Sequence, residues 1–340
     1  MERLKNKQPW KKPLLAIANS NFAGVLIIVI FMSVIMGILR PDFLTANNFN
    51  VLARSFSIIA IVGLAQMVIL AMGGMNLSVG AIGGLAGITV GFLMVRMEVS
   101  IVLAVGAGLF IGALCGSING WLINRIDNRE SGLNVSSFLV TLATASAFTG
   151  INLGITKAIP IYNLPDSFIF LGRGTVGGIT ILVFIMLVIS LLVALVYGYT
   201  SFGRKMLAVG GNLKAAELSG VSIGQVTLLS NIISGLLAAS AAILVVARLG
   251  SAQPDVGSGW LLISFAAPLI GGTRLSGGQV NIFGTLLGAV LLALVSNSLV
   301  HLGIDVYWAT LINGIIIFIA VGIDRIRTLS AEKWGAKAIG

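Results

Sequence analysis

Long apolar runs separated by short polar segments dominate the sequence. Runs of about 20 residues recur from residue 22 almost to the end of the chain, and a helix of that length crosses the hydrocarbon core of a bilayer. We therefore predict an all-α fold, a polytopic transmembrane helical bundle of about ten spans that forms a single domain over residues 1–340. The predicted spans cover residues 22–39, 56–73, 77–95, 100–123, 136–156, 176–198, 225–247, 260–272, 281–301 and 304–323.

The eighth predicted span is the least regular. Residues 260–272 would rise only about 20 Å as a helix, less than a core of about 30 Å. Pro268 and the following Gly271 and Gly272 interrupt the segment further, so it is either a short tilted helix or a broken one. If it did not cross, four C-terminal basic residues would move to the outer side, and we therefore keep ten spans.

Basic residues give the predicted orientation. With the N-terminus inside, 15 of the 21 Lys and Arg residues fall on inner segments, which is the bias that cytoplasmic loops carry. Ten spans then place both termini inside (N-in and C-in), with cytoplasmic tails at residues 1–21 and 326–340. The outer basic residues are Arg40, Arg54, Arg96, Lys157, Arg173 and Arg248.

The composition agrees with a membrane protein and narrows its chemistry. The chain is 57% hydrophobic and only 9% charged, with a mean hydropathy of +1.05, far above a soluble globular chain. Its net charge of +10 comes from basic residues between apolar runs, so we expect contacts with membrane lipid and no nucleic acid. Because the sequence has one histidine and no phosphate-binding loop or hydrolase motif, we expect no enzyme activity, no metal and no cofactor bound by this chain.

A polar segment between the sixth and seventh spans, AVGGNLKAAELSGVSIGQ (208–225), has the pattern of a short surface helix. Asn212 is a good N-cap, and strong helix formers follow it. Gly220 suits the left-handed position after the helix, while Gly210 and Gly211 are expected to separate it from the preceding chain. A docking element and a plain connection between spans both fit this pattern.

This segment and several others resemble one family. GRKMLAVGGNLKAAELSGVSI (203–223) is similar to the cytoplasmic loop of ribose-type sugar permeases of bacterial ABC importers. GGMNLSVGAIGG (73–84), ARLGSAQPDVGSG (247–259) and LIGGTRLSGGQVNIFGTLLGA (269–289) resemble further signatures of that family in the same order. PDFLTANNFNVL (41–52) is typical of it after the first span.

The resemblance implies a cobalamin-importer-like fold and a permease subunit in the bacterial inner (plasma) membrane. Two copies, or one copy and a paralogue, would form the path for a monosaccharide or a similar small polar solute. The implied partners are a cytoplasmic ABC ATPase with two nucleotide-binding halves, which binds ATP and Mg, and a periplasmic sugar-binding protein. Residues 200–224 would be the cytoplasmic coupling loop. The residues implied to couple to the ATPase are Asn212, Lys214, Ala215, Ala216, Glu217, Ser219 and Gly220.

Uncharged polar residues inside the apolar spans are candidates for the translocation path. In the fifth span they share one helix face at 100° per residue, and such a stripe offers hydrogen bonds to a sugar without a trapping charge. The same residue types also mediate helix packing in membranes, and both interpretations stay open. The candidates are Gln66, Asn76, Ser78, Thr141, Thr144, Thr149, Asn152 and Asn297.

Two departures from the family pattern bear on the substrate. Asn76 stands where the signature has Asp, and residues 261–263 lack two acidic residues that often follow GSG. They argue against ribose itself and leave a heterodimer open. The alternatives are an ABC permease for a non-sugar metabolite, such as a nucleoside, a polyol or a signalling furanose, and a stand-alone secondary transporter or channel. The lack of charged groups inside the spans disfavours the stand-alone carrier.

An internal similarity links two of these motifs. GGMNLSVG (73–80) and GGTRLSGG (271–278) match at five of eight positions, and each precedes a long apolar span. Both a remnant of duplication and chance in a glycine-rich chain explain it.

Overall fold

A computed structural model describes residues 23–126 and 132–305, together with positions 308, 311, 312, 314, 315 and 318. The predicted tails, 1–21 and 326–340, and most of the tenth predicted span lie outside these residues. The described elements are α2 (Ala23–Leu39), η1 (Pro41–Leu44), α3 (Ala46–Leu70), α4 (Val79–Arg96), α5 (Ile101–Ile126), α6 (Gly132–Thr156), α7 (Asp166–Arg173), β1 (Thr175–Val176), β2 (Ile179–Thr180), α8 (Ile181–Tyr199), α9 (Ser201–Gly211), α10 (Leu213–Leu218), α11 (Ile223–Leu249), α12 (Trp260–Ile270) and α13 (Ile282–His301).

Seven of the described helices, α3, α4, α5, α6, α8, α11 and α13, are long and apolar enough to cross a membrane. The helices α2 and α12 are apolar but shorter. The prediction of an all-α polytopic bundle is therefore confirmed at this level, and each of the first nine predicted spans coincides with a described helix.

Two helix starts differ from the predicted boundaries. Helix α3 begins at Ala46 rather than at residue 56, because the Thr45 hydroxyl caps it by accepting the Asn48 N–H at 3.3 Å. Helix α8 begins at Ile181 rather than at residue 176. The preceding residues pair as the ribbon β1–β2 around Gly177 and Gly178, whose φ angles of +59° and +83° require a turn.

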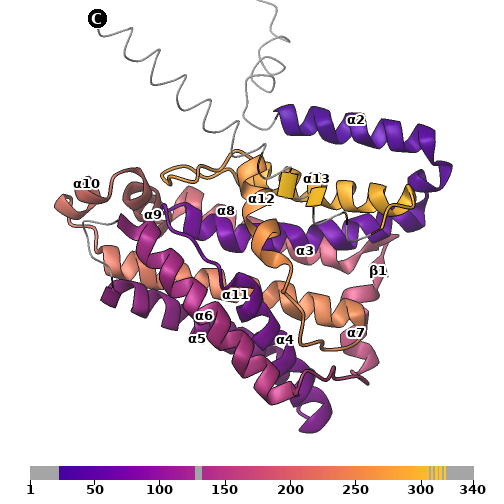
Figure 1. Cartoon of the computed structure of the whole chain (residues 1–340), viewed down its shortest axis with the longest axis horizontal. Helices are drawn as coiled ribbons and strands as arrows, with labels where there is room; N and C mark the ends of the chain where they lie inside the picture. Colours follow the sequence, from indigo (N-terminus) through magenta and orange to yellow (C-terminus); the bar gives the residue numbers. More distant parts are fainter. Residues whose placement is uncertain are drawn as a thin grey trace, which may run out of the picture.

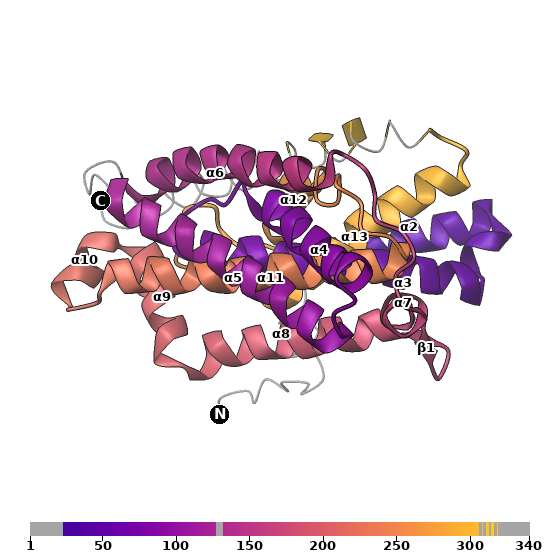
Figure 2. The same ribbon diagram turned by 90° about the horizontal axis from the view of Figure 1, so that it is seen from below.

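The long helices run along one common direction. Figure 2 shows α5, α6, α8 and α11 side by side along the long axis, with α9 and α10 at one end and α7 and the ribbon at the other. We call these the α10 end and the α7 end. Helix α4 is largely buried within the bundle. Helix α12 packs against α3 and α13 (Figure 1) and leaves Leu261 and Leu262 exposed.

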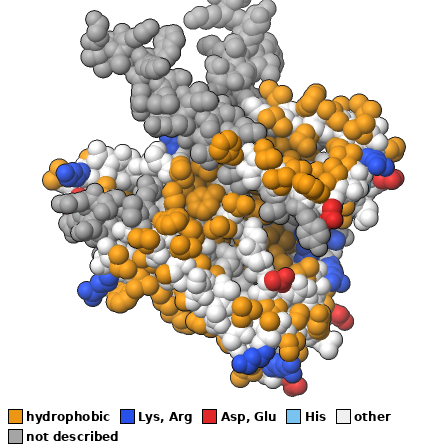
Figure 3. All heavy atoms as spheres, in the orientation of Figure 1, with side chains coloured by type: hydrophobic (Ala, Val, Ile, Leu, Met, Phe, Trp, Pro, Cys, Tyr) orange, Lys and Arg blue, Asp and Glu red, His pale blue; other side chains and the backbone are white. Residues whose placement is uncertain are grey.

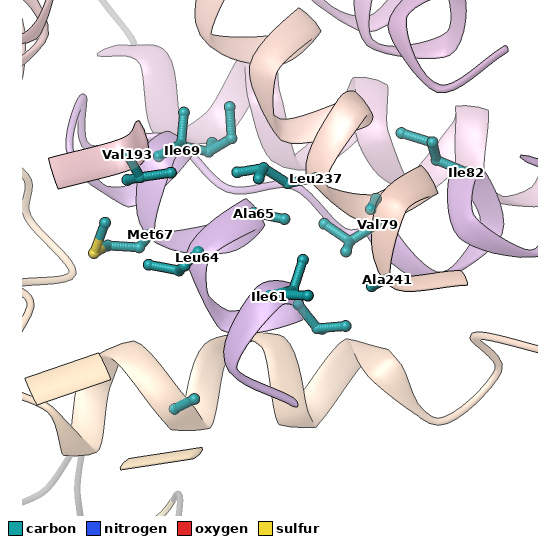
Figure 4. Close-up of a cluster of buried hydrophobic side chains, with 14 of the residues drawn as sticks. Ile61, Leu64, Ala65, Met67, Ile69, Val79, Ile82, Val193, Leu237 and Ala241 are labelled. Carbon is teal, nitrogen blue, oxygen red and sulfur yellow. The ribbon is translucent and has the colours of Figure 1, made fainter. Parts of the chain in front are cut away.

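The centre of the bundle is the contact of α11 with α3, α4 and α5. Helix α3 is apolar on all sides and almost entirely buried from Ser57 to Leu70, as expected for a core helix. Figure 4 shows Ile61 and Ala65 of α3 close to Leu237 of α11 and Val79 of α4. These apolar contacts hold the start of α4 against α3 and α11, which are both largely buried.

Apolar side chains also cover much of the outside. In Figure 3, hydrophobic side chains spread over the face shown, while Lys, Arg, Asp and Glu lie mainly toward its edges. Large exposed apolar side chains are frequent on α2, α5 and α8, among them Phe31, Val102 and Leu191. An apolar surface of this extent suits contact with lipid tails or with further helices.

Candidate functional site

Two segments enter the bundle without helical structure. Residues 71–78 leave α3 at the α10 end and return inward before α4 begins. Residues 251–259 leave α11 at the α7 end, where Gly250 takes the left-handed conformation, and run inward before α12 begins. Each segment thus interrupts the helical path before the helix that follows it, as in the discontinuous helices that expose backbone groups inside membrane transporters.

The two discontinuous segments meet where α4 begins. A Cβ atom on Gly80 would collide with the Gly257 carbonyl oxygen, and one on Gly257 would collide with the Gly80 carbonyl oxygen. A Cβ on Gly84 would lie 2.7 Å from the Val256 carbonyl oxygen. The chain before α12 therefore packs backbone to backbone along the first turns of α4, and only glycine allows this approach.

Side chains bond the peptide groups of residues 75–77. The Met75 N–H donates to Ser137 Oγ at 2.9 Å, and the Leu77 N–H donates to Thr141 Oγ1 at 3.0 Å. In the orientation that its neighbours require, the Gln66 amide donates to the Asn76 carbonyl at 2.8 Å and accepts from the Asn76 N–H at 3.2 Å. Non-helical backbone inside an apolar bundle needs such partners, because neither lipid nor apolar side chains supply them.

A buried polar network surrounds the start of α4. Asn76 Nδ2 donates to Ser234 Oγ of α11 at 3.1 Å, and Ser78 Oγ donates to Asn76 Oδ1 at 2.7 Å. Asn119 Nδ2 of α5 donates to Ser78 Oγ at 2.7 Å. All four side chains are fully buried. The network joins three helices without any charge, which lowers the cost of placing it in a low-dielectric interior.

Asn119 and Ser234 were not among the predicted site residues. Each is an uncharged polar residue within an apolar run, the same signal that singled out Gln66 and Asn297. A search for every buried amide in a predicted span would have found Asn119. Ser234 has no distinguishing signal, because serine is common on the packed faces of membrane helices.

A cavity of about 670 Å³ lies between α4, α6 and residues 253–258. Its size falls within the range of about 300–1,000 Å³ typical of small-molecule pockets. Loop residues after α6, among them Pro160 and Tyr162, line it together with Gly80 at the first turn of α4. The first turns of α4 and residues 253–258 of the second discontinuous segment thus form part of the cavity wall.

Asn152 is one of several polar residues of the cavity wall, together with Gln253, Asp255 and Ser258. Its Nδ2 donates to the Pro254 carbonyl at 2.8 Å. Its Oδ1 is buried and has no hydrogen-bond partner among the described residues. Thr149, one turn earlier on α6 and exposed, lies on the same wall.

The eight predicted path residues fall into three places. Thr149 and Asn152 line the cavity. Asn297 lies elsewhere: its amide pairs with that of Asn48 in two hydrogen bonds of 2.9 and 3.1 Å between α13 and α3. The other five form or adjoin the support of the discontinuous segment at the start of α4: Gln66, Asn76, Ser78, Thr141 and Thr144.

The coupling segment has one more helix than predicted. Gly210 and Gly211 do not separate it from the chain before, because α9 continues through both of them. The Thr200 hydroxyl caps α9 by accepting the Gly203 N–H at 3.1 Å. Buried Met206 and Val209 hold one face of α9 against the bundle.

Helix α10 has the caps that the sequence predicts. Asn212 Oδ1 accepts the Ala215 N–H at 2.9 Å, and Gly220 adopts a left-handed φ of +79°. Ala216 is only 4% exposed and packs into this chain's own core, whereas Leu218 is 89% exposed. The exposed face of α10 therefore includes Leu218, which was not among the predicted coupling residues, and lacks Ala216.

Among the described residues, no group of three or more His, Cys, Asp or Glu side chains is arranged to hold a metal ion. The polar groups of the network are amides and hydroxyls, and the cavity lining adds one carboxylate, that of Asp255. Amides, hydroxyls and a single carboxylate can all bond a solute that carries several hydroxyls.

Comparison with known proteins gives the family. The model of the family described as "Branched-chain amino acid transport system / permease component" matches residues 48–321. The chain belongs to this permease family. It is therefore a multi-pass membrane transport component and not an enzyme, and the seven long apolar helices agree with this.

Several curated relatives match nearly the whole chain. The ribose import permease of Bacillus subtilis is 37% identical over 89% of this chain and 91% of its own length. The D-allose transport system permease of Escherichia coli is 32% identical over 95% and 98%. The fructose import permease of Rhizobium meliloti is 33% identical over 92% and 88%. These relatives confirm the resemblance to sugar permeases; no solved structure matches the chain.

Proposed function

We propose that the chain is the transmembrane permease subunit of an ATP-driven ABC importer in the bacterial inner membrane. Its cargo is a monosaccharide or a similar small polar solute. The observation that carries this proposal is that permeases named for ribose, D-allose and fructose import match the chain over about nine-tenths of its length. We assign no single sugar, because these relatives differ in theirs.

The cavity at the α7 end is the proposed entry to the translocation path. Its wall carries the Thr149 hydroxyl, the Asn152 side chain and the Asp255 carboxylate. The polar network begins at Ser78, two residues before the cavity-lining Gly80, and continues to Asn119 of α5. A sugar leaving the cavity inward would thus meet further amides and hydroxyls when the start of α4 and the segment before α12 move apart.

We assign one proposed partner protein to each end of the molecule. At the α10 end, the exposed face of α10 would dock on a cytoplasmic ATPase with two nucleotide-binding halves, in which ATP and Mg are bound. At the α7 end, a periplasmic sugar-binding protein would deliver the solute. A second permease copy or a paralogue would complete the path. Ten spans with N-in and C-in orientation remain part of this proposal, supported by the excess of basic residues on inner segments.

Gentle extraction of the tagged chain from its native membrane tests the proposal. Mass spectrometry of the purified complex should find an ABC ATPase at comparable amount, and proteoliposomes holding the complex should take up a sugar only with ATP and the binding protein. A second permease-like chain at equal amount would indicate a heterodimer. Purification of the chain alone, with solute transport that needs no ATP, would contradict the proposal.

A further inference from the structure

Three glycine-containing segments meet at the α10 end. They are the end of α3, the loop between α12 and α13, and the last turn of α9. The Gly278 N–H donates to the Ala71 carbonyl oxygen at 3.0 Å. A Cβ atom on Gly210 would collide with that same oxygen and lie 2.5 Å from the Gly278 nitrogen.

Gly277 makes equally close contacts with two of these segments. A Cβ atom on Gly277 would lie 2.5 Å from the Gly73 nitrogen and 2.9 Å from the Gly210 Cα. We call Gly73, Gly210, Gly277 and Gly278 the glycine junction. At this junction backbone touches backbone, so no flexible side chain absorbs a displacement, and movement of one segment moves the others.

Helix α9 connects the glycine junction to α10. Helix α9 ends at Gly211, and Asn212 alone connects it to α10. Met206 and Val209 are 0% and 2% exposed, which fixes α9 to the bundle on the side of Gly210. A push or pull on α10 therefore reaches Gly210 through a short, stiff connection.

The other two segments of the junction connect it to the region of the cavity. Residues 71–78 run from the junction to Asn76 and then to the first turn of α4, which lines the cavity. The loop that contains Gly277 follows α12, and Gly257, in the segment that leads into α12, touches Gly80. The two motifs of similar sequence, GGMNLSVG and GGTRLSGG, thus carry the two halves of one contact.

We propose that the glycine junction transmits movement of α10 to both discontinuous segments and so opens and closes the inner side of the cavity. This assigns a positioning role to residues remote from the solute, and it rests on the proposed function of the chain. Such transmission needs a contact that does not deform gradually. A contact of backbone against backbone, with no flexible side chain between, meets that need.

Gly210 and Gly211 provide a matched test of the proposal. Both lie in the last turn of α9, and neither has a left-handed φ. A Cβ on Gly211 meets nothing within 4 Å, whereas one on Gly210 collides with the junction. Both Gly→Ala variants thus add one methyl group, but only the one at 210 collides with the glycine junction.

In proteoliposomes holding the full importer, Gly210→Ala should lower sugar uptake by about tenfold or more, the scale of coupling between sites, while ATP hydrolysis continues. Gly211→Ala should transport as the unchanged protein does. Equal uptake by both variants would overturn the proposed role of the junction. Failure of the unchanged chain to bind an ATPase would instead contradict the proposed function of the chain, on which that role rests.

A second measurement avoids the risk that Gly210→Ala does not assemble. Ser276 is exposed beside Gly73, and a cysteine there can be labelled in a Cys115→Ser background. Trapping the ATPase with ATP and vanadate should change the labelling rate of Ser276→Cys, while Asp166→Cys at the exposed start of α7, remote from the junction, should keep its rate. Unchanged labelling at 276 in a complex that transports would overturn the proposal.

Discussion

Asn76 organises the polar interior through every group that it has. Its backbone pairs with the Gln66 amide, its Nδ2 donates to Ser234 and its Oδ1 accepts from Ser78. The residue therefore fixes the place where residues 71–78 stop and α4 begins. An aspartate, which the family signature carries here, would offer two acceptors and no donor in the same place.

We predict that Asn76→Asp is tolerated because Ser234 can reverse its hydrogen bond. The Ser234 hydroxyl now accepts at 3.1 Å, and rotation of its proton would let it donate to a carboxylate. Ser234→Ala removes that donor, so one carboxylate oxygen keeps its Ser78 partner while the other is buried without a donor, which is costly. Thermal unfolding of the purified variants should show that the double variant loses about 1–2 kcal/mol more than the two single variants together. Additive losses would contradict the prediction.

The same residues show how far sequence reasoning reaches at this scale. The stripe on α6 was predicted as one wall, yet Thr149 and Asn152 line the cavity while Thr141 bonds the Leu77 backbone. Helical periodicity places these residues on one face. Periodicity does not show where the neighbouring chain is non-helical. A hydroxyl beside non-helical chain bonds its peptide groups, and one elsewhere is free for a solute. The hydrogen-bond partners of Asn76 could not be predicted for the same reason.

At the scale of elements, α12 explains the irregular eighth span. Helix α12 has 11 residues, too few to cross alone, and the non-helical residues 251–259 supply the remaining path. The sequence correctly left a broken helix open, because Pro268 and the flanking glycines are visible in it. The third predicted span, residues 77–95, comes close to α4, which begins at Val79. The inward course of residues 71–78 was not predicted, because hydropathy locates a break between spans but not the path of the chain within it.

Helix α10 carries a prediction of its own. Leu218 is 89% exposed, so its side chain contributes little to this chain's fold, and an apolar tip of this kind suits a pocket on a soluble partner. Leu218→Asp should abolish co-purification of the ATPase while the permease inserts and unfolds normally. Affinity purification followed by gel quantification measures this.

Two comparisons separate docking from general damage to α10. Gln225→Asp places the same charge at an exposed position at the start of α11 and should leave ATPase binding intact. Ala216→Trp should instead lower the thermal stability of the isolated permease, because Ala216 is buried in its own core. Full ATPase binding by Leu218→Asp would show that the exposed tip is not the docking surface.

For the whole molecule, the orientation of the bundle decides which partner meets which end. The tenth predicted span lies mostly outside the described residues, so its crossing and the positions of both termini remain predictions. The crossing at α12 can be examined directly, since Asp255 and Ser276 are exposed on either side of it. If residues 251–270 cross as proposed, these two positions lie on opposite sides of the membrane.

We predict that an impermeant maleimide labels Asp255→Cys from the periplasmic side and labels Ser276→Cys only after the inner membrane is opened. The Cys115→Ser background removes the single native thiol. Tyr162→Cys and Ser219→Cys serve as outer and inner references, because both residues are exposed and lie at opposite ends of the bundle. Labelling of positions 255 and 276 from the same side would mean that α12 turns back. An odd number of crossings would then place the C-terminal basic residues outside, against the charge bias of membrane proteins.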